Sequence, residues 1–195
     1  LSFSSIAVAT ENFPQYDNIQ PNVSFWVKAY SKYTTQQAVV HDSTHLNLIY
    51  DVIDLKPHDA YRARKINRQR MKNARAKYRK ILKRLAANPS LRNRTARRVA
   101  ALFGLNASAD SYRRAAKRVR CQIGQRDRFR AGLIRSGAYI DRIREIFTAN
   151  GLPVELAYLP HVESSFNYQA YSRFGAADIW LFPVWMSEPF MEVVY

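Results

Sequence analysis

The residues of this chain best suited to catalysis lie around Glu163, in the run Glu163-Ser164-Ser165-Phe166-Asn167. A carboxyl group acts as a general acid only if it keeps its proton near neutral pH, and an apolar environment favours this by raising the carboxyl pKa. The apolar residues available for this are Leu159, Val162, Phe166 and Trp180. A lone helical glutamate is ordinarily an exposed carboxylate, so the surrounding residues must carry the case for chemistry at Glu163.

Other reactive side chains give weaker patterns. His161 precedes Glu163 by two residues, a spacing that puts the two on different faces of a helix, so we interpret it as structural or substrate-facing. His41, Asp42 and His45 have no further ligand at a useful spacing, which favours a capped turn over a metal site. Cys121 is the single cysteine and fits a small core residue better than a nucleophile. We therefore expect no metal site.

The segment from Leu152 to Asn167 resembles the first catalytic motif of bacterial lytic transglycosylases with a soluble-lytic-transglycosylase (SLT) type domain, most closely the membrane-bound murein transglycosylase D group. Residues 125–147 resemble the lead-in helices of that group, through Phe129, Gly132 and Arg135 among others. Residues 12–55 are similar to its N-terminal extension. The resemblance thus touches most of the chain and is weakest in the middle.

The resemblance implies a peptidoglycan lyase without a cofactor. Glu163 would protonate the oxygen that links N-acetylmuramic acid to N-acetylglucosamine, and would then act as a base toward the muramic acid's own 6-hydroxyl, giving a 1,6-anhydro sugar. Because no water is activated, no second catalytic carboxylate is needed. Ser164, Asn167 and Trp180 are implied as substrate-binding residues.

The next family motif, Gly-Ala-Ala-Gly-Ile-Trp-Gln-Phe, is matched by residues 175–182 with two departures. Asp178 replaces a glycine at a tightly packed backbone, and Leu181 replaces a glutamine whose amide would hydrogen-bond in the cleft. The similarity then fades, and the family's later helices do not follow. We therefore expect an incomplete catalytic domain with weak or no activity.

Helical periodicity dominates the chain. Apolar residues at helical spacing predict helices after Pro21 and over residues 61–87, and further helices are predicted over 90–103, 108–122, 126–136 and 138–149. Gly104, Gly124 and Gly137 fit helix ends. Branched and aromatic residues around 38–55 predict a pair of strands joined by a turn at Asp42. A new helix is predicted from Pro153 to Glu163.

The charge is strongly asymmetric. The net charge is +16, and residues 61–145 hold 27 of the 31 Lys and Arg but only four acidic residues. Such a segment attracts polyanions, so the alternative function is a non-enzymatic helical module that binds nucleic acid or another polyanion. Few aromatic residues interleave with the cations, as a platform for stacking bases would require. We therefore expect no specific nucleic-acid partner and favour peptidoglycan glycan strands.

These observations predict a mainly α protein in three parts. Residues 1–60 form an extension with a short helix and a strand pair, residues 61–124 a basic helical region, and residues 125–195 the lead-in helices and start of a lysozyme-like, all-α catalytic domain. No signal peptide or apolar span is present, and residue 1 is not Met. The resemblance implies the periplasm or cell envelope, with membrane association through a signal or anchor that this chain lacks.

Overall fold

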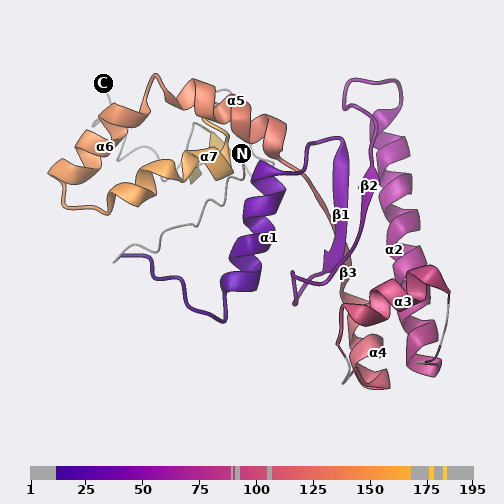
Figure 1. Ribbon diagram of the computed structural model, residues 1–195. Coiled ribbons are helices and arrows are strands. Elements are labelled where there is room, and N and C mark those ends of the chain that lie inside the picture. Colours follow the sequence, from indigo (N-terminus) through magenta and orange to yellow (C-terminus); the bar gives the residue numbers. More distant parts are fainter. Residues whose placement is uncertain are drawn as a thin grey trace, which may run out of the picture. The chain divides into compact units, whose positions relative to one another are not determined.

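The computed structural model describes residues 12–88, 90, 93–104, 107–167 and the two-residue strands β4 (Ala176–Ala177) and β5 (Phe182–Pro183), which pair with each other. The chain divides into two compact units, Leu1–Arg126 and Asp127–Tyr195. The predicted mainly α class with a small sheet is confirmed (Figure 1). None of the helices in the described residues is both long and apolar enough to cross a membrane.

The first unit is built on a three-stranded antiparallel sheet in the order β2-β1-β3. Its strands are β1 (Gln37–Asp42), β2 (Ile49–Asp54) and β3 (Val119–Ile123). The predicted strand pair is therefore confirmed. The prediction of helix through residue 122 is wrong, because α4 ends at Arg118 and the next five residues pair with β1. This pairing satisfies the second edge of the central strand, which is buried from Ala38 to Asp42.

Helices cover both faces of this sheet (Figure 1). On one face lies α1 (Gln20–Ser31), which starts next to Pro21 and buries Phe25 and Ala29. The Phe25 ring packs against His41 of β1 at 4.6 Å between centroids. Trp26, the next residue, is 42% exposed.

The other face of the sheet carries the main core. Three helices contribute to it: α2 (Ala63–Ala87), α3 (Arg94–Ala101) and α4 (Ala109–Arg118). Asn93 and Ser108 accept backbone N–H bonds at the starts of α3 and α4, which are the caps that short helices need. Tyr50 of β2 stacks on Tyr78 of α2 at 5.8 Å. The predicted strand pair and the basic helices thus share one core.

The turn after β1 confirms the predicted cap. Asp42 is fully buried, and its carboxylate accepts the backbone N–H groups of Thr44 and His45 at 2.8 and 3.0 Å. Arg118 Nε, at the end of α4, donates to both carboxylate oxygens at 2.9 and 3.0 Å. Asp42 therefore serves the fold rather than a metal. Cys121 is likewise structural: it is half-buried against the core, and burial raises the pKa of its thiol.

The prediction that Gly124 ends a helix is wrong, because Gly124 directly follows strand β3. A Cβ atom there would lie 2.3 Å from the backbone carbonyl of Tyr33. The backbone N–H of Gly124 donates to Gln37 and that of Arg126 to Tyr33. Glycine is required at this position because two chain segments touch without room for a side chain.

The described part of the second unit consists mainly of short helices. They are α5 (Arg126–Ser136), which starts at the last residue of the first unit, α6 (Ile140–Ala149), the 3-10 helix η1 (Val154–Tyr158) and α7 (Pro160–Glu163). Gly151 follows the C-cap of α6 with a φ of +67°, the left-handed conformation in which glycine commonly ends a helix. The single helix predicted from Pro153 to Glu163 is wrong, because Pro160 starts a new short helix after η1.

Candidate functional site

Glu163 is the last residue of α7, and its side chain is exposed. The backbone after it turns back on the helix. Ser164 N–H and Phe166 N–H both donate to the Pro160 carbonyl, at 3.2 and 3.1 Å. Asn167 N–H lies within hydrogen-bond distance of the Ser164 carbonyl and hydroxyl oxygens, at 3.2 and 3.3 Å. Three of the predicted site residues, Glu163, Ser164 and Asn167, therefore share one compact turn.

The other predicted site residue, Trp180, lies outside the described residues. So do Asp178 and Leu181, the two departures from the family motif. The structure therefore describes the first predicted motif and, of the second, only the backbone of Ala176, Ala177 and Phe182.

The turn contains backbone strain. Ser165 and Phe166 have φ values of +55° and +52°, in the left-handed region that non-glycine residues rarely adopt. Such residues cost free energy and persist only where the surrounding structure imposes them. Two such residues follow the candidate acid within three positions, so the conformation of residues 163–167 must be imposed by the structure around it.

Helix α5 imposes this conformation. The Arg135 guanidinium donates from Nε and Nη2 to the Ser165 carbonyl oxygen, at 3.0 and 2.6 Å. Gly132, one turn earlier on α5, lets the helix approach so closely that a Cβ atom there would lie 3.0 Å from the same oxygen. The carbonyl is thus fixed by a charged donor and by close packing.

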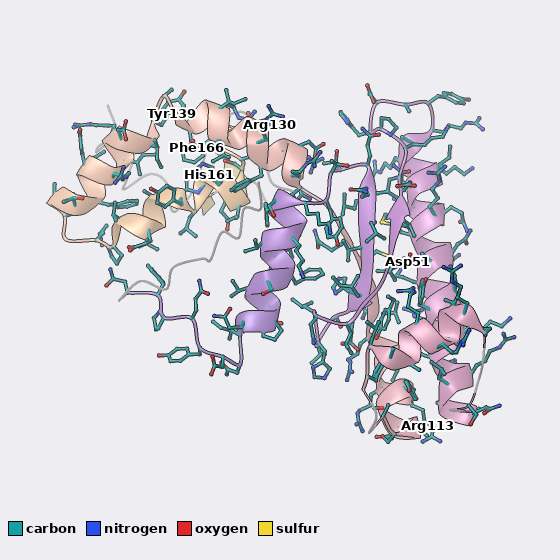
Figure 2. All side chains as sticks on the ribbon, in the orientation of Figure 1. Asp51, Arg113, Arg130, Tyr139, His161 and Phe166 are labelled. Carbon is teal, nitrogen blue, oxygen red and sulfur yellow. The ribbon has the colours of Figure 1, made fainter. Side chains whose placement is uncertain are left out.

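His161 anchors α7 from the inside. It is 4% exposed, with Nδ1 at 3.1 Å from the Tyr158 carbonyl and Nε2 at 3.1 Å from Ser136 Oγ. Its ring lies beside Phe166 (Figure 2), which it meets edge-on at 4.5 Å between centroids. The Phe129 ring lies 5.6 Å away. Because the carbonyl only accepts, Nδ1 carries the proton in the neutral ring. The Ser136 hydroxyl then shares its single proton between Nε2 and the Leu133 carbonyl oxygen, which lies 2.9 Å from Oγ.

This environment disfavours the charged ring. Burial lowers the pKa of His161, opposed by its bond to the Tyr158 carbonyl. Of the two interpretations of His161, the structural one is confirmed, since a buried imidazole held on both nitrogens has no free atom to offer a substrate.

The expected apolar shield around Glu163 is only partly present in the described residues. Phe166 is buried beneath the turn, whereas Leu159 and Val162 are 43% and 47% exposed. These two side chains give an apolar surface beside an exposed carboxylate, without enclosing it. A ligand lying across them would remove water from the carboxylate.

Sequence reasoning missed the supports of this turn. The contacts of Arg135 and Ser136 join positions 30 and 25 residues apart, which no local pattern reveals. It also missed Glu155 of η1, whose Oε2 is buried and has no hydrogen-bond partner among the described residues. In that part of the chain, no group of three or more His, Cys, Asp or Glu could hold a metal ion.

No protein-family model, no curated protein and no solved structure matches this chain. The resemblance to lytic transglycosylases therefore rests on the residues of the motif themselves, and the geometry of the turn at Glu163 is the independent observation that bears on function.

Proposed function

We propose that this chain belongs to a peptidoglycan lytic transglycosylase that acts in the periplasm or cell envelope, with Glu163 as its general acid and then its base. The observation that carries the proposal is the exposed carboxylate of Glu163 next to a strained turn, which Arg135 and His161 fix from beneath. Fixed backbone and an accessible functional group are what positional catalysis requires.

In the proposed reaction, protonated Glu163 donates to the oxygen that links muramic acid to N-acetylglucosamine. The glycosidic bond then breaks through an oxocarbenium-like state. The resulting carboxylate takes the proton of the muramic acid 6-hydroxyl as that oxygen bonds to C1. The proton returns to Glu163, and the products are a 1,6-anhydro sugar and a free sugar hydroxyl.

The surroundings of Glu163 offer an apolar surface on which a glycan could pack. Leu159 and Val162 expose apolar surface beside it, and a sugar ring packed there would withdraw the carboxyl group from water. Ser164 and Asn167, in the same turn, are proposed to orient the glycan. On this proposal α5, α6, η1 and α7 form the opening of a lysozyme-like lobe, and no metal or organic cofactor takes part.

The test is mass spectrometry of the products released from purified peptidoglycan. We expect a low yield of anhydro-muropeptides from the parent chain, in keeping with the departures at Asp178 and Leu181, and none from Glu163→Gln, because the amide cannot donate or accept the proton. A matched control is Glu145→Gln, which changes an exposed glutamate of α6 that pairs with Arg142 at 3.1 Å. It should retain the parent's activity.

Two outcomes contradict the proposal. Equal release by the parent and Glu163→Gln assigns the chemistry to another group. No release by the parent, with its circular dichroism showing folded helices, rejects transglycosylase activity for this chain.

A further inference from the structure

Helix α2 presents a cationic surface that the proposed reaction does not use. It carries eleven Lys and Arg in 25 residues and no acidic residue. Ten of these cations are exposed. They are Arg64, Lys65, Arg68, Arg70, Lys72, Lys77, Arg79, Lys80, Lys83 and Arg84. The buried stripe of the helix, with Tyr78, Leu82 and Leu85, fixes which side faces out.

The outward cations form a line. Lys65, Lys72 and Arg79 recur at seven-residue intervals, two helical turns apart, and Lys83 follows one turn later. From Lys65 to Lys83 the line is roughly 27 Å long at about 1.5 Å per residue. Figure 1 shows α2 as a straight helix on the sheet. We call this line the α2 ridge.

The second half of the ridge is hollowed. Ala76 and Ala87 leave a shallow depression of about 490 Å³ whose other lining residues are all cations, Arg79, Lys80, Lys83 and Arg84. Four positive side chains around one hollow repel one another unless an anion occupies it. The hollow therefore favours a ligand that carries discrete anionic groups.

Protein carboxylates do not neutralise the ridge. Of the ion pairs in the described residues, only Lys77 with Asp51, at 3.7 Å, involves α2. Arg70 Nη1 donates to the Asp54 carbonyl, toward β2. Lys77 and Arg70 lie beside the ridge and are not part of it. No ion pair in the described residues involves the cations of the ridge itself, so they are available to an external anion.

The contacts of α2 argue against recognition of bases. Gln69 Nε2 donates to Asn73 Oδ1, and Asn67 bonds to the backbone of Lys56, so these amides are engaged within the protein. No large hydrophobic or aromatic side chain is exposed within 63–123 of the described chain, and the exposed Tyr61 just before α2 is a single ring with the Arg62 guanidinium over it at 5.0 Å. A single strand would therefore find no stacking platform. A duplex strand completes a turn in about 34 Å, so it would wind away from a straight row of this length.

A flat anionic surface, unlike a nucleic-acid strand, can contact all the cations of the straight α2 ridge at the same time. We propose that the α2 ridge docks this protein electrostatically on a bilayer surface of anionic phospholipid, with headgroup phosphates at its cations and the hollow at residues 76–87. No large apolar side chain is exposed on the described residues of α2, which makes this surface contact rather than insertion. The site is independent of Glu163 and of the proposed reaction.

The test compares vesicles of neutral phospholipid with vesicles that contain about one third anionic phospholipid. The parent chain should sediment with the anionic vesicles at about 0.05 M salt, and release should follow at about 0.5 M salt. Lys72→Glu/Arg79→Glu/Lys83→Glu should weaken partitioning by roughly 100-fold, because each cation near an anionic surface contributes several-fold.

The matched control is Arg113→Glu/Arg128→Glu/Arg130→Glu, which changes the net charge equally at exposed positions outside α2. It should retain most of the binding, and circular dichroism should show both variants folded. Equal losses in the two variants would assign binding to net charge alone and overturn the α2 ridge as the site.

Two further results overturn the proposal. A duplex or single-stranded oligonucleotide that displaces the protein from vesicles, and itself binds more tightly at equal phosphate concentration, makes nucleic acid the partner. Failure of the parent to bind anionic vesicles at low salt leaves the ridge as a solvated face.

Discussion

At the scale of single residues, the candidate site depends on one backbone carbonyl. Ser165 accepts two hydrogen bonds from Arg135, and Gly132 lies against the same oxygen. Ser165 and Phe166 keep left-handed conformations that are unfavourable for their residue types. The two hydrogen bonds from the guanidinium therefore offset part of the conformational free energy that these two residues cost, and they hold the turn after α7 in place.

Removal of this guanidinium should destabilise the turn. We expect Arg135→Ala to lower the free energy of unfolding by about 1–3 kcal/mol, because a carbonyl loses two charge-assisted donors. Arg130→Ala is the matched control, since Arg130 lies on the same helix and is exposed. Urea denaturation followed by circular dichroism measures both. An unchanged stability in Arg135→Ala would show that packing alone holds the turn.

At the scale of elements, the segment after α1 and the segment after β3 contact each other in the first unit through backbone hydrogen bonds. The backbone N–H of Gly124 donates to Gln37 at 3.0 Å, and that of Gln125 to Ala29 at 2.8 Å. These bonds tie the end of β3 to α1 and to the start of β1. Backbone groups thus join α1 to the sheet, in addition to the packing of Phe25 on His41.

Gly124→Ala should therefore be more damaging than a glycine change elsewhere. The added Cβ would lie 2.3 Å from Tyr33 and 2.5 Å from Thr34 backbone atoms, which cannot rotate away. We expect a loss of about 3 kcal/mol or more in the free energy of unfolding. Gly137→Ala, whose nearest atom would be 3.5 Å away, should change it by less than about 1 kcal/mol. Similar midpoints in urea for the two variants would contradict this.

The elements that the sequence predicts well are those with a local signal. The strand pair at 37–54 and the helix at 63–87 follow from changes in hydrophobic period. Strand β3 is missed because five residues after a helical pattern carry little strand signal, and its partner β1 lies about eighty residues earlier. Pro160 is missed as a break because apolar residues continue through it.

The same distinction applies to the site. The motif predicts Glu163, Ser164 and Asn167 because they are adjacent in sequence, and the structure places them in one turn. Their supports, Arg135 and Ser136, come from a separate helix, and only the folded chain brings them to Ser165 and His161. Long-range contacts of this kind leave no periodicity in the sequence.

At the scale of the whole molecule, both units bury a histidine. In the first, burial lowers the pKa of His41, opposed by Asp42 and reinforced by Arg120. In the second, burial lowers the pKa of His161, opposed by the Tyr158 carbonyl. Each unit therefore folds around a neutral imidazole, so acidification affects both units in the same direction.

This arrangement sets the sign of the pH dependence. The ordinary histidine pKa is 6.5, and both folded values lie below it. As pH falls below 6.5 the unfolded chain binds protons that the folded chain does not, so stability is lost until the folded pKa values are reached. Above 6.5 neither state is protonated, and the stability is fully present. Carboxylates titrate mostly at lower pH, so the range from about pH 7 to about pH 5 isolates the histidines.

We expect the urea midpoint of the parent to fall over this range, and His161→Gln to remove part of the decrease. The glutamine amide can still donate to a carbonyl and accept from a hydroxyl, so the variant removes the titration while keeping polar partners. His58→Gln changes an exposed histidine and should leave the slope as it is. A parent midpoint that is flat or rises toward pH 5 would mean that the buried rings are charged in the folded state. The contacts of His161 with the Tyr158 carbonyl and Ser136 would then have to be reassigned as two donated bonds from an imidazolium, and α7 would be anchored by charge.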